Sequence, residues 1–226
     1  MNKIGRLCLI TDTAIQKNYS HLQIAKMAVK GGADILQLRD KTLPTGKLID
    51  ISKKIAALCR EHKVLFIVND RVDVVMASGA DGVHLGNEDI PVKDARRLLG
   101  SRKIIGGTAH SLKEALLRQY EGADYVGFGH IYPTKSKFKP EKAKGTNMLS
   151  EVVKKVKIPV IAIGGISLSN IDDVAGTNVH GIAVIGSVLR SPEPVKTLKE
   201  LKKKITGYNY GSGQQIKEVC VNNCRI

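Results

Sequence analysis

The chain has 226 residues, of which 42% are apolar and 4% aromatic, and it contains no tryptophan. Lysine and arginine number 36 against 21 aspartates and glutamates, for a formal net charge of +15. This length suits one large domain with a buried core, and the shortage of aromatic rings argues against a carbohydrate or nucleic-acid site built on stacked rings. The charge favours a polyanionic ligand such as nucleic acid, an acidic membrane or a phosphorylated small molecule, although a lysine-coated, solvated surface accounts for it equally well.

The N-terminal stretch MNKIGRLCLITD does not resemble a signal peptide, because its apolar run is short and soon reaches Asp12. No stretch of the sequence is apolar for long enough to span a bilayer. Cys8 and Cys59 fall in a predicted strand and a predicted helix, where free buried thiols are common. Cys220 and Cys224 lie in a polar stretch, and two cysteines alone fall short of the four ligands of a structural zinc. We therefore expect a cytoplasmic protein in which the role of the second pair stays open.

Short β-branched runs alternate with amphipathic segments along the chain. The predicted strands are residues 6–12, 35–40, 64–70, 82–86, 103–109, 125–131, 159–165 and 181–187. The predicted helices are residues 21–32, 45–62, 71–79, 92–100, 111–122, 148–156, 168–176 and 192–205. Eight strand–helix pairs predict a closed (β/α)8 barrel, and the alternative, an open doubly wound sheet, lacks a G-x-G-x-x-G motif after the first strand.

The pattern divides the chain in two. We assign residues 1–207 to a single barrel domain and residues 208–226, which begin glycine-rich and have little periodicity, to a C-terminal tail outside it with freedom to move. Within the barrel, the tripeptide Gly-Ala-Asp precedes the second, fourth and sixth predicted strands and ends at Asp34, Asp81 and Asp124. The recurrence indicates a shared structural unit in which a helix end leads into the next strand.

The second predicted strand ends in the sequence QLRDK. Side chains alternate along a strand, so Gln37, Arg39 and Lys41 share one face while Leu38 and Asp40 share the other. In a barrel of this kind the active site forms at the carboxyl ends of the strands. Two cations and an amide pointing into the barrel mouth would clamp a polyphosphate. Ion pairs with nearby carboxylates are the alternative.

The third and fourth predicted strands are followed by Asp70 and Asp89, which places both at the same rim. Two carboxylates with room for waters and substrate oxygens suit Mg²⁺, which usually takes few protein ligands. The alternatives are local: Asp70 could cap the helix that follows, and Asp89 could close a turn before Ile90 and Pro91. The neighbouring cationic strand end favours the metal site.

The remaining strand ends suit a second anion. The sixth predicted strand leads to a loop with Thr134, Ser136 and Lys137, and the seventh and eighth end in IGGI and VIGS. Glycines there expose backbone N–H groups in a position that often binds phosphate, a use compatible with an ordinary tight turn. His84 lies within a strand, as a core histidine does, and His110 stands where a helix begins. Two anion sites predict two phosphorylated substrates that meet over the barrel.

Together these strand ends resemble the family of the thiamine-phosphate synthases, which also contains the thiazole tautomerases. The resemblance runs from Leu7 to Leu201. It rests on dispersed motifs in order: LITD, QLRDK, VNDRVD, DGVHLGNED, GGTAHS, GADYVGFG, PTKSK, IPVIAIGGI and GIAVIGS. It implies a (β/α)8 barrel and a Mg²⁺-dependent transfer in which a thiazole ethyl phosphate displaces pyrophosphate from 4-amino-2-methyl-5-pyrimidinylmethyl diphosphate, giving thiamine phosphate.

The resemblance also implies roles for particular residues. The pyrimidine diphosphate would contact Gln37, Arg39, Lys41, Asn69 and Thr108. Mg²⁺ would be held by Asp70 and Asp89. The thiazole phosphate would contact Thr134, Lys135, Ser136, Gly165, Ile185 and Gly186. The charge of the leaving diphosphate would be stabilised by Arg39, Lys41 and Lys137.

Four positions depart from the pattern of the synthases. Thr108 replaces a usual serine and keeps its hydroxyl, Asp40 replaces a usual glutamate on the outward face, and Gly186 replaces a frequent serine. His130 stands where synthases usually have proline and tautomerases have a histidine that resembles an acid/base catalyst. A thiazole phosphate tautomerase that uses His130 is therefore the first alternative. The second, a non-catalytic binder of a phosphorylated ligand or nucleic acid, would not need two rim aspartates. The sequence does not predict the oligomeric state.

Overall fold

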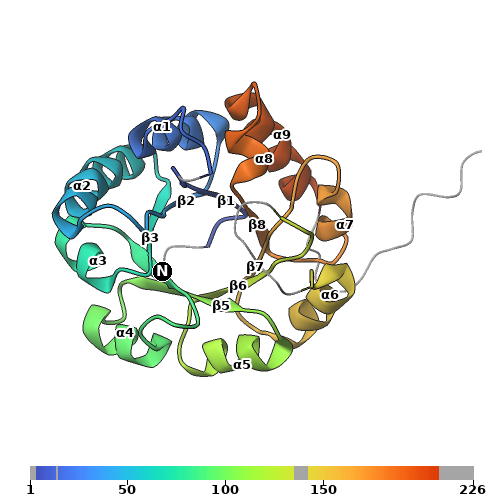
Figure 1. The fold of residues 1–226 in the computed structure, drawn as a ribbon. Coiled ribbons are helices and arrows are strands. Elements are labelled where there is room, and N and C mark those ends of the chain that lie inside the picture. The colour runs from blue at the N-terminus through green and yellow to red at the C-terminus, as the bar shows by residue number, and fades with distance from the viewer. Residues whose placement is uncertain (1–3, 14, 135–141, 209–226) are drawn as a thin grey trace, which may run out of the picture.

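A computed structural model of the chain describes residues 4–13, 15–134 and 142–208. Eight parallel strands close into a barrel in which each strand pairs with the next and β8 pairs with β1 (Figure 1). The strands are β1 (Leu7–Ile10), β2 (Ile35–Leu38), β3 (Leu65–Asn69), β4 (Gly82–Leu85), β5 (Ile104–Ala109), β6 (Tyr125–Gly129), β7 (Val160–Ile163) and β8 (Gly181–Val184). The predicted (β/α)8 barrel is confirmed.

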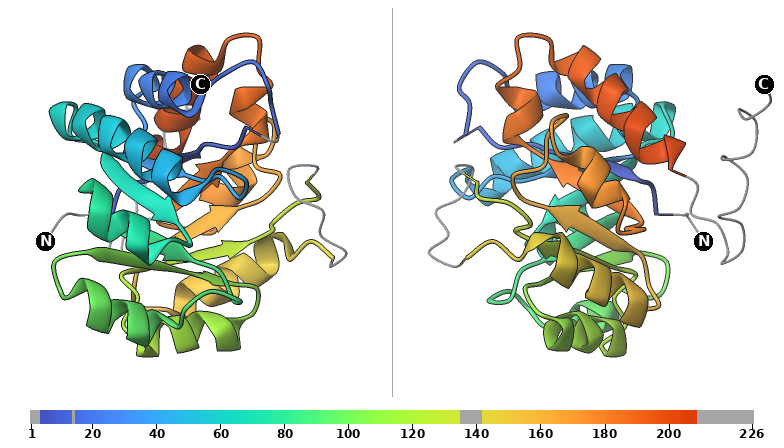
Figure 2. Two further views of the ribbon diagram at one scale, coloured as in Figure 1. Left: turned by 60° about the vertical axis from the view of Figure 1, so that its left-hand side comes forward. Right: turned by 90° about the vertical axis from the view of Figure 1, so that its right-hand side faces the viewer.

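Helices surround the barrel on its outside (Figures 1 and 2). They are α1 (His21–Gly31), α2 (Thr45–Glu61), α3 (Val72–Ser78), α4 (Val92–Leu99), α5 (Leu112–Tyr120), α6 (Gly145–Lys155), α7 (Ile171–Ala175), α8 (Gly186–Leu189) and α9 (Pro194–Gly207). The short helix α8 was not predicted and precedes the predicted last helix. None of the helices in the described ranges has the length and apolar character to cross a membrane.

The strands bury both of their faces, which explains their almost unbroken apolar sequences. Outward side chains such as Leu36, Phe66 and Phe128 pack against the helices in the larger apolar cluster. Inward side chains such as Cys8, Ile35 and Ile67 form a second cluster inside the barrel. Because side chains alternate along each strand, the polar residues that follow the inward set are directed into the barrel mouth.

The three Gly-Ala-Asp repeats make the same contact at the amino ends of the strands. The carboxylates of Asp34, Asp81 and Asp124 accept the backbone N–H groups of Leu7 (3.0 Å), Phe66 (2.8 Å) and Ile105 (2.7 Å). Each aspartate also donates its own backbone N–H to the carbonyl oxygen of that same residue. The aspartate of each repeat thus leads into one strand and makes two hydrogen bonds with the strand before it. These contacts lie at the end of the barrel away from the predicted site.

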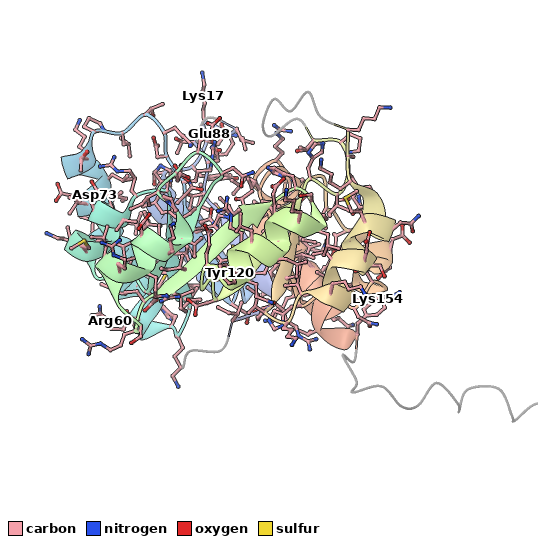
Figure 3. All side chains as sticks on the ribbon, turned by 90° about the horizontal axis from the view of Figure 1, so that it is seen from below. Lys17, Arg60, Asp73, Glu88, Tyr120 and Lys154 are labelled. Atoms are coloured by element: carbon pink, nitrogen blue, oxygen red, sulfur yellow. The ribbon has the colours of Figure 1, made fainter. Side chains whose placement is uncertain are left out.

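The two ends of the barrel are distinct in a side view. Figure 3 shows Lys17 and Glu88, from the loops after β1 and β4, at one rim and Arg60, near the end of α2, at the other. The loops that follow the strands therefore gather at one end of the molecule. Polar residues placed there by eight different strands can meet around a single cavity.

Candidate active site

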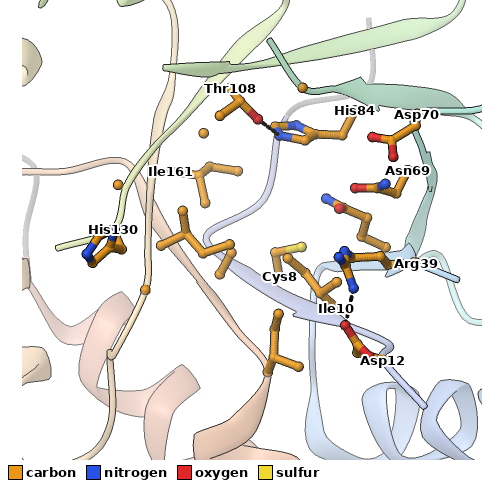
Figure 4. A pocket seen from close by; sticks show the side chains of 18 of the residues that line it. Cys8, Ile10, Asp12, Arg39, Asn69, Asp70, His84, Thr108, His130 and Ile161 are labelled. Atoms are coloured by element: carbon orange, nitrogen blue, oxygen red, sulfur yellow. Dashed lines mark hydrogen bonds and ion pairs between the residues drawn. The ribbon is translucent and has the colours of Figure 1, made fainter. Parts of the chain in front are cut away.

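A cavity of about 470 Å³ opens at the carboxyl ends of the strands. Its floor is apolar and comes from the inward faces of β1, β7 and β8, through Cys8, Ile161 and Ala183. Its walls are polar and come from the residues that follow β2, β3, β4 and β5 (Figure 4). A substrate with an aromatic ring and a charged group could therefore place the ring on the floor and the charge against the wall.

Gln37 and Arg39 line this cavity as alternation predicts. Gln37 is 5% exposed, so its amide is held inside the barrel. The guanidinium of Arg39 donates to the carboxylate of Asp12, which follows β1 and is itself buried. The ion pair that was the alternative to a substrate clamp is present. It is compatible with a clamp, because a guanidinium has five N–H donors and Asp12 engages only part of that set.

Lys41 and Asp70 form a second ion pair, with 2.6 Å between the lysine Nζ and the aspartate Oδ2. Lys41 is largely exposed at the rim, whereas Asp70 is mostly buried. Asp70 adopts a left-handed backbone conformation with φ of 65°, and its N–H donates to the carbonyl oxygen of His84 (2.8 Å). Its side chain makes no cap to α3, whose N-cap residue is Arg71. The helix-cap alternative for Asp70 is therefore wrong.

Asp89 closes the turn after β4, because its Oδ2 accepts the N–H of Gly86 (2.6 Å). The approach is close, since a Cβ on Gly86 would lie 2.9 Å from that oxygen and would displace the carboxylate. The turn points the Asp89 carboxyl group at Asp70, with which it makes a hydrogen bond. The turn alternative and a metal role are thus compatible for Asp89.

The two carboxyl groups influence each other's ionisation. Burial raises the pKa of Asp89, and the contact with Asp70 raises it further. Burial also acts on Asp70, but hydrogen bonds with Asp89 and Lys41 outweigh it and lower the pKa of Asp70. Lys41 compensates one negative charge of the pair, and the second carboxylate needs a further positive charge to ionise beside the first. A divalent cation between them would supply that charge, so this pair fits the oxygen-ligated Mg²⁺ that the sequence predicts.

His84 lies on β4 at the inner wall, between two hydroxyl groups. Its Nδ1 is 3.0 Å from the Tyr125 hydroxyl and its Nε2 is 3.0 Å from Oγ1 of Thr108. Burial lowers the pKa of His84 to about 4, with a further contribution from the charge of Arg118. The neutral imidazole fixes the Thr108 hydroxyl at the cavity surface. The prediction of a satisfied core histidine agrees with these contacts, and the sequence analysis missed the link to Thr108.

His130 lies across the cavity from Arg39, Asn69 and Asp70 (Figure 4). It follows β6, lines the cavity and is 5% exposed. Gly164 is packed against it, because a Cβ on that glycine would come within 2.3 Å of the His130 Cβ. His130 is therefore held at a wall of its own, away from the cationic residues.

A second cavity of about 270 Å³ joins the first along a border that includes Thr134, Gly164 and Ile185. It is lined by the turns after β7 and β8, where Gly164 and Gly165 adopt φ values of 101° and 68°. Glycine adopts such conformations without steric cost, and its lack of a side chain lets a ligand come close to the backbone of this turn. Arg190, which the sequence analysis missed, adds an exposed cation to this cavity. It follows the unpredicted helix α8.

The structure places all of the predicted site residues that it describes in these two cavities. The first cavity contains Gln37, Arg39, Lys41, Asn69, Asp70, Asp89, Thr108, His130, Thr134 and Ile185, and the second contains Thr134, Gly165, Ile185 and Gly186. Lys135, Ser136 and Lys137 lie outside the described residues. In the described ranges, no group of three or more His, Cys, Asp and Glu side chains forms a metal site, and Asp70 with Asp89 is the pair that remains for the predicted Mg²⁺.

Comparison with known proteins assigns this architecture to one family. Residues 7–188 match the family model described as Thiamine monophosphate synthase. A thiamine-phosphate synthase of Chlorobium phaeovibrioides is 50% identical over 188 residues, which is 83% of this chain and 88% of the relative. That of Pyrococcus horikoshii is 42% identical over 200 residues, which is 88% of this chain and 94% of the relative.

Solved structures agree with these relatives. A thiamine phosphate pyrophosphorylase from Pyrococcus furiosus superposes with a TM-score of 0.82 at 39% identity and covers 90% of this chain and 96% of its own. A 3-hexulose-6-phosphate synthase superposes with a TM-score of 0.63 at 18% identity, covering 88% of this chain and 99% of its own. At that identity the likeness concerns the fold alone.

Proposed function

The chain belongs to the thiamine monophosphate synthase family, and from that premise we propose how the two cavities divide the reaction between them. Its activity is that of a thiamine-phosphate synthase, which joins 4-amino-2-methyl-5-pyrimidinylmethyl diphosphate to a thiazole ethyl phosphate and releases pyrophosphate. The observation that supports our proposal is the pair of connected cavities, one cationic with paired carboxylates and the other lined by glycine-rich turns. Each is suited to one phosphorylated substrate.

We assign the pyrimidine diphosphate to the first cavity. Arg39 and Lys41 approach from the loop after β2, and the buried amide of Gln37 and the side chain of Asn69 line the wall beside them. Cations held in a partly buried site attract phosphate oxygens more strongly than cations in water. The Thr108 hydroxyl, oriented by His84, is placed to contact the pyrimidine. The aromatic ring then rests on the apolar floor.

Asp70 and Asp89 are the residues that would hold Mg²⁺. Their carboxyl groups are in contact, and burial together with the neighbouring Asp70 raises the pKa of Asp89, which a bound cation would oppose. When bound, Mg²⁺ supplies charge neutralisation for the leaving diphosphate. Lys41, which is within ion-pair distance of Asp70, is close enough to contact the same phosphate groups.

The chain supplies positioning and charge for the transfer. The bond from the pyrimidine methylene to the diphosphate oxygen breaks, and its electron pair leaves with the pyrophosphate. Arg39 and Lys41 stabilise that developing negative charge. The bond that forms joins the methylene to the thiazole nitrogen, so the reaction requires no protein nucleophile. Lys137, outside the described residues, keeps the leaving-group role that the resemblance implies.

We assign the thiazole phosphate to the second cavity. The turns that contain Gly165 and Gly186 present backbone N–H groups, and Ile185 provides an apolar contact at the border with the first cavity. Arg190 adds a positive charge that the sequence analysis did not foresee. Thr134 lines both cavities, where its hydroxyl can contact this phosphate, and Lys135 and Ser136 follow it outside the described residues.

A coupling assay tests the assigned activity. The purified protein is incubated with both substrates and Mg²⁺, and thiamine phosphate and pyrophosphate are measured together. We expect the two products in equal amounts and neither product when one substrate is omitted. Release of pyrophosphate without thiamine phosphate would identify a hydrolase, and no turnover with both substrates present would reject the activity.

The carboxylate pair has its own test. Asp70→Asn and Asp89→Asn keep the side-chain size but remove one negative charge each. We expect each variant to need a higher Mg²⁺ concentration for half-maximal rate and to turn over more slowly at saturating metal. Asp50→Asn, which changes an exposed carboxylate on α2 outside both cavities, is the matched control. Normal metal dependence in both aspartate variants would reject the assignment.

The tautomerase alternative depends on His130, which lines the cavity and carries an imidazole able to move a proton at neutral pH. Coupling moves no proton through the protein, so His130→Ala should keep most coupling activity when the aromatic thiazole phosphate is supplied. The non-aromatic thiazole carboxylate tautomer is then supplied to both proteins. Conversion by the wild type but not by His130→Ala, with no coupling by either, would replace the synthase with the isomerase.

A further inference from the structure

His21 is a buried histidine that lines neither cavity. It is the first residue of α1, is 5% exposed and uses both ring nitrogens. Its Nδ1 lies 2.8 Å from the Thr11 hydroxyl and its Nε2 lies 2.8 Å from Oδ2 of Asp40. Because this ring is separated from the substrates, any effect on the reaction must pass through those two neighbours.

The hydrogen bonds around His21 can all be satisfied together by one tautomer of the ring. The backbone N–H of Arg39 donates to Oγ1 of Thr11 (3.1 Å). The single hydrogen of the Thr11 hydroxyl can then be donated to Nδ1 of His21, and the Nε2–H of His21 is donated to Asp40. A neutral imidazole with its proton on Nε2 satisfies every group in this chain of contacts. The buried ring therefore connects the backbone at Arg39 to the side chain at Asp40.

Asp40 is the second fixed point of this network. Its Oδ1 accepts the backbone N–H groups of Thr42 (2.7 Å) and Leu43 (2.8 Å), and its Oδ2 also accepts from the Thr13 hydroxyl (3.2 Å). Burial raises the pKa of Asp40, but the bonds from His21 and the backbone outweigh burial and hold it well below its usual range. The ionised carboxylate thus joins the loop after β1, the start of α1 and the loop after β2.

Arg39 and Lys41 flank Asp40 in sequence and point to the opposite side. Asp40 is directed outward to His21, while the two cations line the first cavity. Thr11 accepts the backbone N–H of Arg39, and Asp12, the residue after Thr11, accepts from the Arg39 guanidinium. Contacts on the outer side of the strand end therefore fix the backbone that carries both cations, while Asp12 and Asp70 hold the charged groups inside the cavity. A network that fixes Asp40 therefore also fixes the backbone of Arg39 and Lys41 on either side of it.

We propose that His21 is a positioning residue that keeps Arg39 and Lys41 in the geometry required by the diphosphate substrate, acting through Thr11 and Asp40. This inference rests on the function proposed above. Misplacing a charged group by a fraction of its contact distance costs transition-state stabilisation even when the group itself is intact. The thiazole phosphate site, built on β7 and β8, has no part in this network.

A double-mutant cycle tests the proposal. His21→Phe keeps a ring of similar size and removes both polar contacts. We measure kcat and KM for each substrate in the wild type, His21→Phe, Arg39→Ala and the double variant. We expect His21→Phe to lower kcat/KM for the pyrimidine diphosphate by about tenfold and to leave KM for the thiazole phosphate unchanged. In the Arg39→Ala background the same change should cost less than it does in the wild type, because only the part of the effect that passes through Lys41 remains.

Two further variants keep the result interpretable. Thr11→Val removes the hydroxyl that connects Arg39 to His21. It should also lower kcat/KM for the pyrimidine diphosphate, and should lower it less in the Arg39→Ala background. If His21→Phe does not fold, the cycle is run on Thr11→Val. His21→Gln, whose amide can donate to Asp40 and accept from Thr11, should recover most of the loss.

The matched control is His180→Phe. His180 contacts the backbone carbonyl of Ile4 (2.8 Å), just before the amino end of β1. This variant should lower the melting temperature without changing either KM. Equal losses for His21→Phe with and without Arg39, or equal effects on both substrates, would show a merely structural role and overturn the proposal. A wild type that fails to couple the substrates would instead reject the proposed function.

Discussion

Arg39 combines the two roles that a leaving-group clamp needs. Its backbone N–H is fixed by Thr11 and its guanidinium by Asp12, so it is held in place before a substrate arrives. Its remaining donors face the cavity. Preorganised charge of this kind costs no reorganisation at the moment when the diphosphate leaves.

Removal of Arg39 therefore has a specific expected cost. Arg39→Ala should lower kcat for coupling on the order of 10²-fold, which is the typical loss of one charge-stabilising contact. Arg39→Lys keeps the charge without the planar fork and should recover part of the rate. Steady-state kinetics with saturating thiazole phosphate give both values. Unchanged kinetics for the pyrimidine diphosphate in Arg39→Ala would show that the clamp is elsewhere.

The low pKa of His84 predicts how the free energy of unfolding depends on pH. Its folded pKa of about 4 lies below the ordinary value of 6.5. A depressed folded pKa contributes stability that is present above pH 6.5 and is lost as the pH falls through about 4, because the unfolded chain takes up the proton first. That shift corresponds to an effect on the order of 3 kcal/mol.

The measurement is the free energy of unfolding in urea at several pH values for the wild type and His84→Gln. Between pH 7 and pH 4 the wild type should lose more stability than the variant, by on the order of 3 kcal/mol. The other ionisable groups are common to both proteins and cancel in the difference. Parallel pH profiles would show that the imidazole is not held neutral.

At the scale of elements, the Gly-Ala-Asp repeats explain how consecutive strand–helix units fit together. Asp81 accepts the N–H of Phe66 at the start of β3 and donates its own N–H to the carbonyl of the same residue. Asp34 and Asp124 do the same for β1 and β5. These contacts lie at the amino ends of the strands, where they serve folding and have no access to the substrates.

Asp81→Ala leaves the buried N–H of Phe66 without its acceptor. We expect a loss of about 1–3 kcal/mol in the free energy of unfolding and unchanged kcat and KM. Asp81→Asn keeps an oxygen acceptor and should lose less. Chemical denaturation combined with the coupling assay tests both points. A fall in kcat for Asp81→Ala, measured on folded protein, would contradict the separation of the two barrel ends.

The number and order of the elements could be predicted from the sequence because each relies on local information. Hydrophobic runs of four to seven residues, amphipathic segments and the recurring repeats identify eight strand–helix pairs without reference to distant residues. Two helix boundaries differ from the predicted ones. Helix α6 begins at Gly145, three residues before the predicted start, and α7 is shorter than predicted because its first residues form a turn around Ser167 and Asn170.

The site was predictable where alternation and strand order decide it. Gln37 and Arg39 share a face because the pleat requires it, and Asp70 and Asp89 meet because β3 and β4 are neighbours. The rest depends on contacts between segments that local patterns do not connect. His21 and Asp40 are 19 residues apart in sequence, and Arg190 reaches its cavity only because the short helix α8 turns it there.

At the scale of the whole molecule, barrel closure is complete within the described residues. β8 pairs with β1 from Leu7 to Leu9, and α9 packs against α1 and the start of β1. The chain up to Tyr208 therefore contains every strand and every helix of the described fold. The tail with Cys220 and Cys224 lies outside the described residues, and its separation from the barrel domain stays a prediction.

Truncation after Tyr208 tests that division. The barrel keeps its closing strand pair and α9, so the shortened protein should retain its melting temperature and its coupling rate. Thermal unfolding and steady-state kinetics of the full-length and shortened proteins give the comparison. A melting temperature lower by more than a few degrees would show that the tail packs on the barrel or on a second chain.

The central claim is that one barrel mouth holds both substrates at once, each in its own cavity. Isothermal titration of the protein with pyrophosphate in the presence of Mg²⁺, repeated on protein saturated with thiazole phosphate, measures this directly. We predict that pyrophosphate binds with one-to-one stoichiometry in both titrations and with little change in affinity. Loss of pyrophosphate binding when thiazole phosphate is present would mean that the two anions compete for one site and would contradict the account.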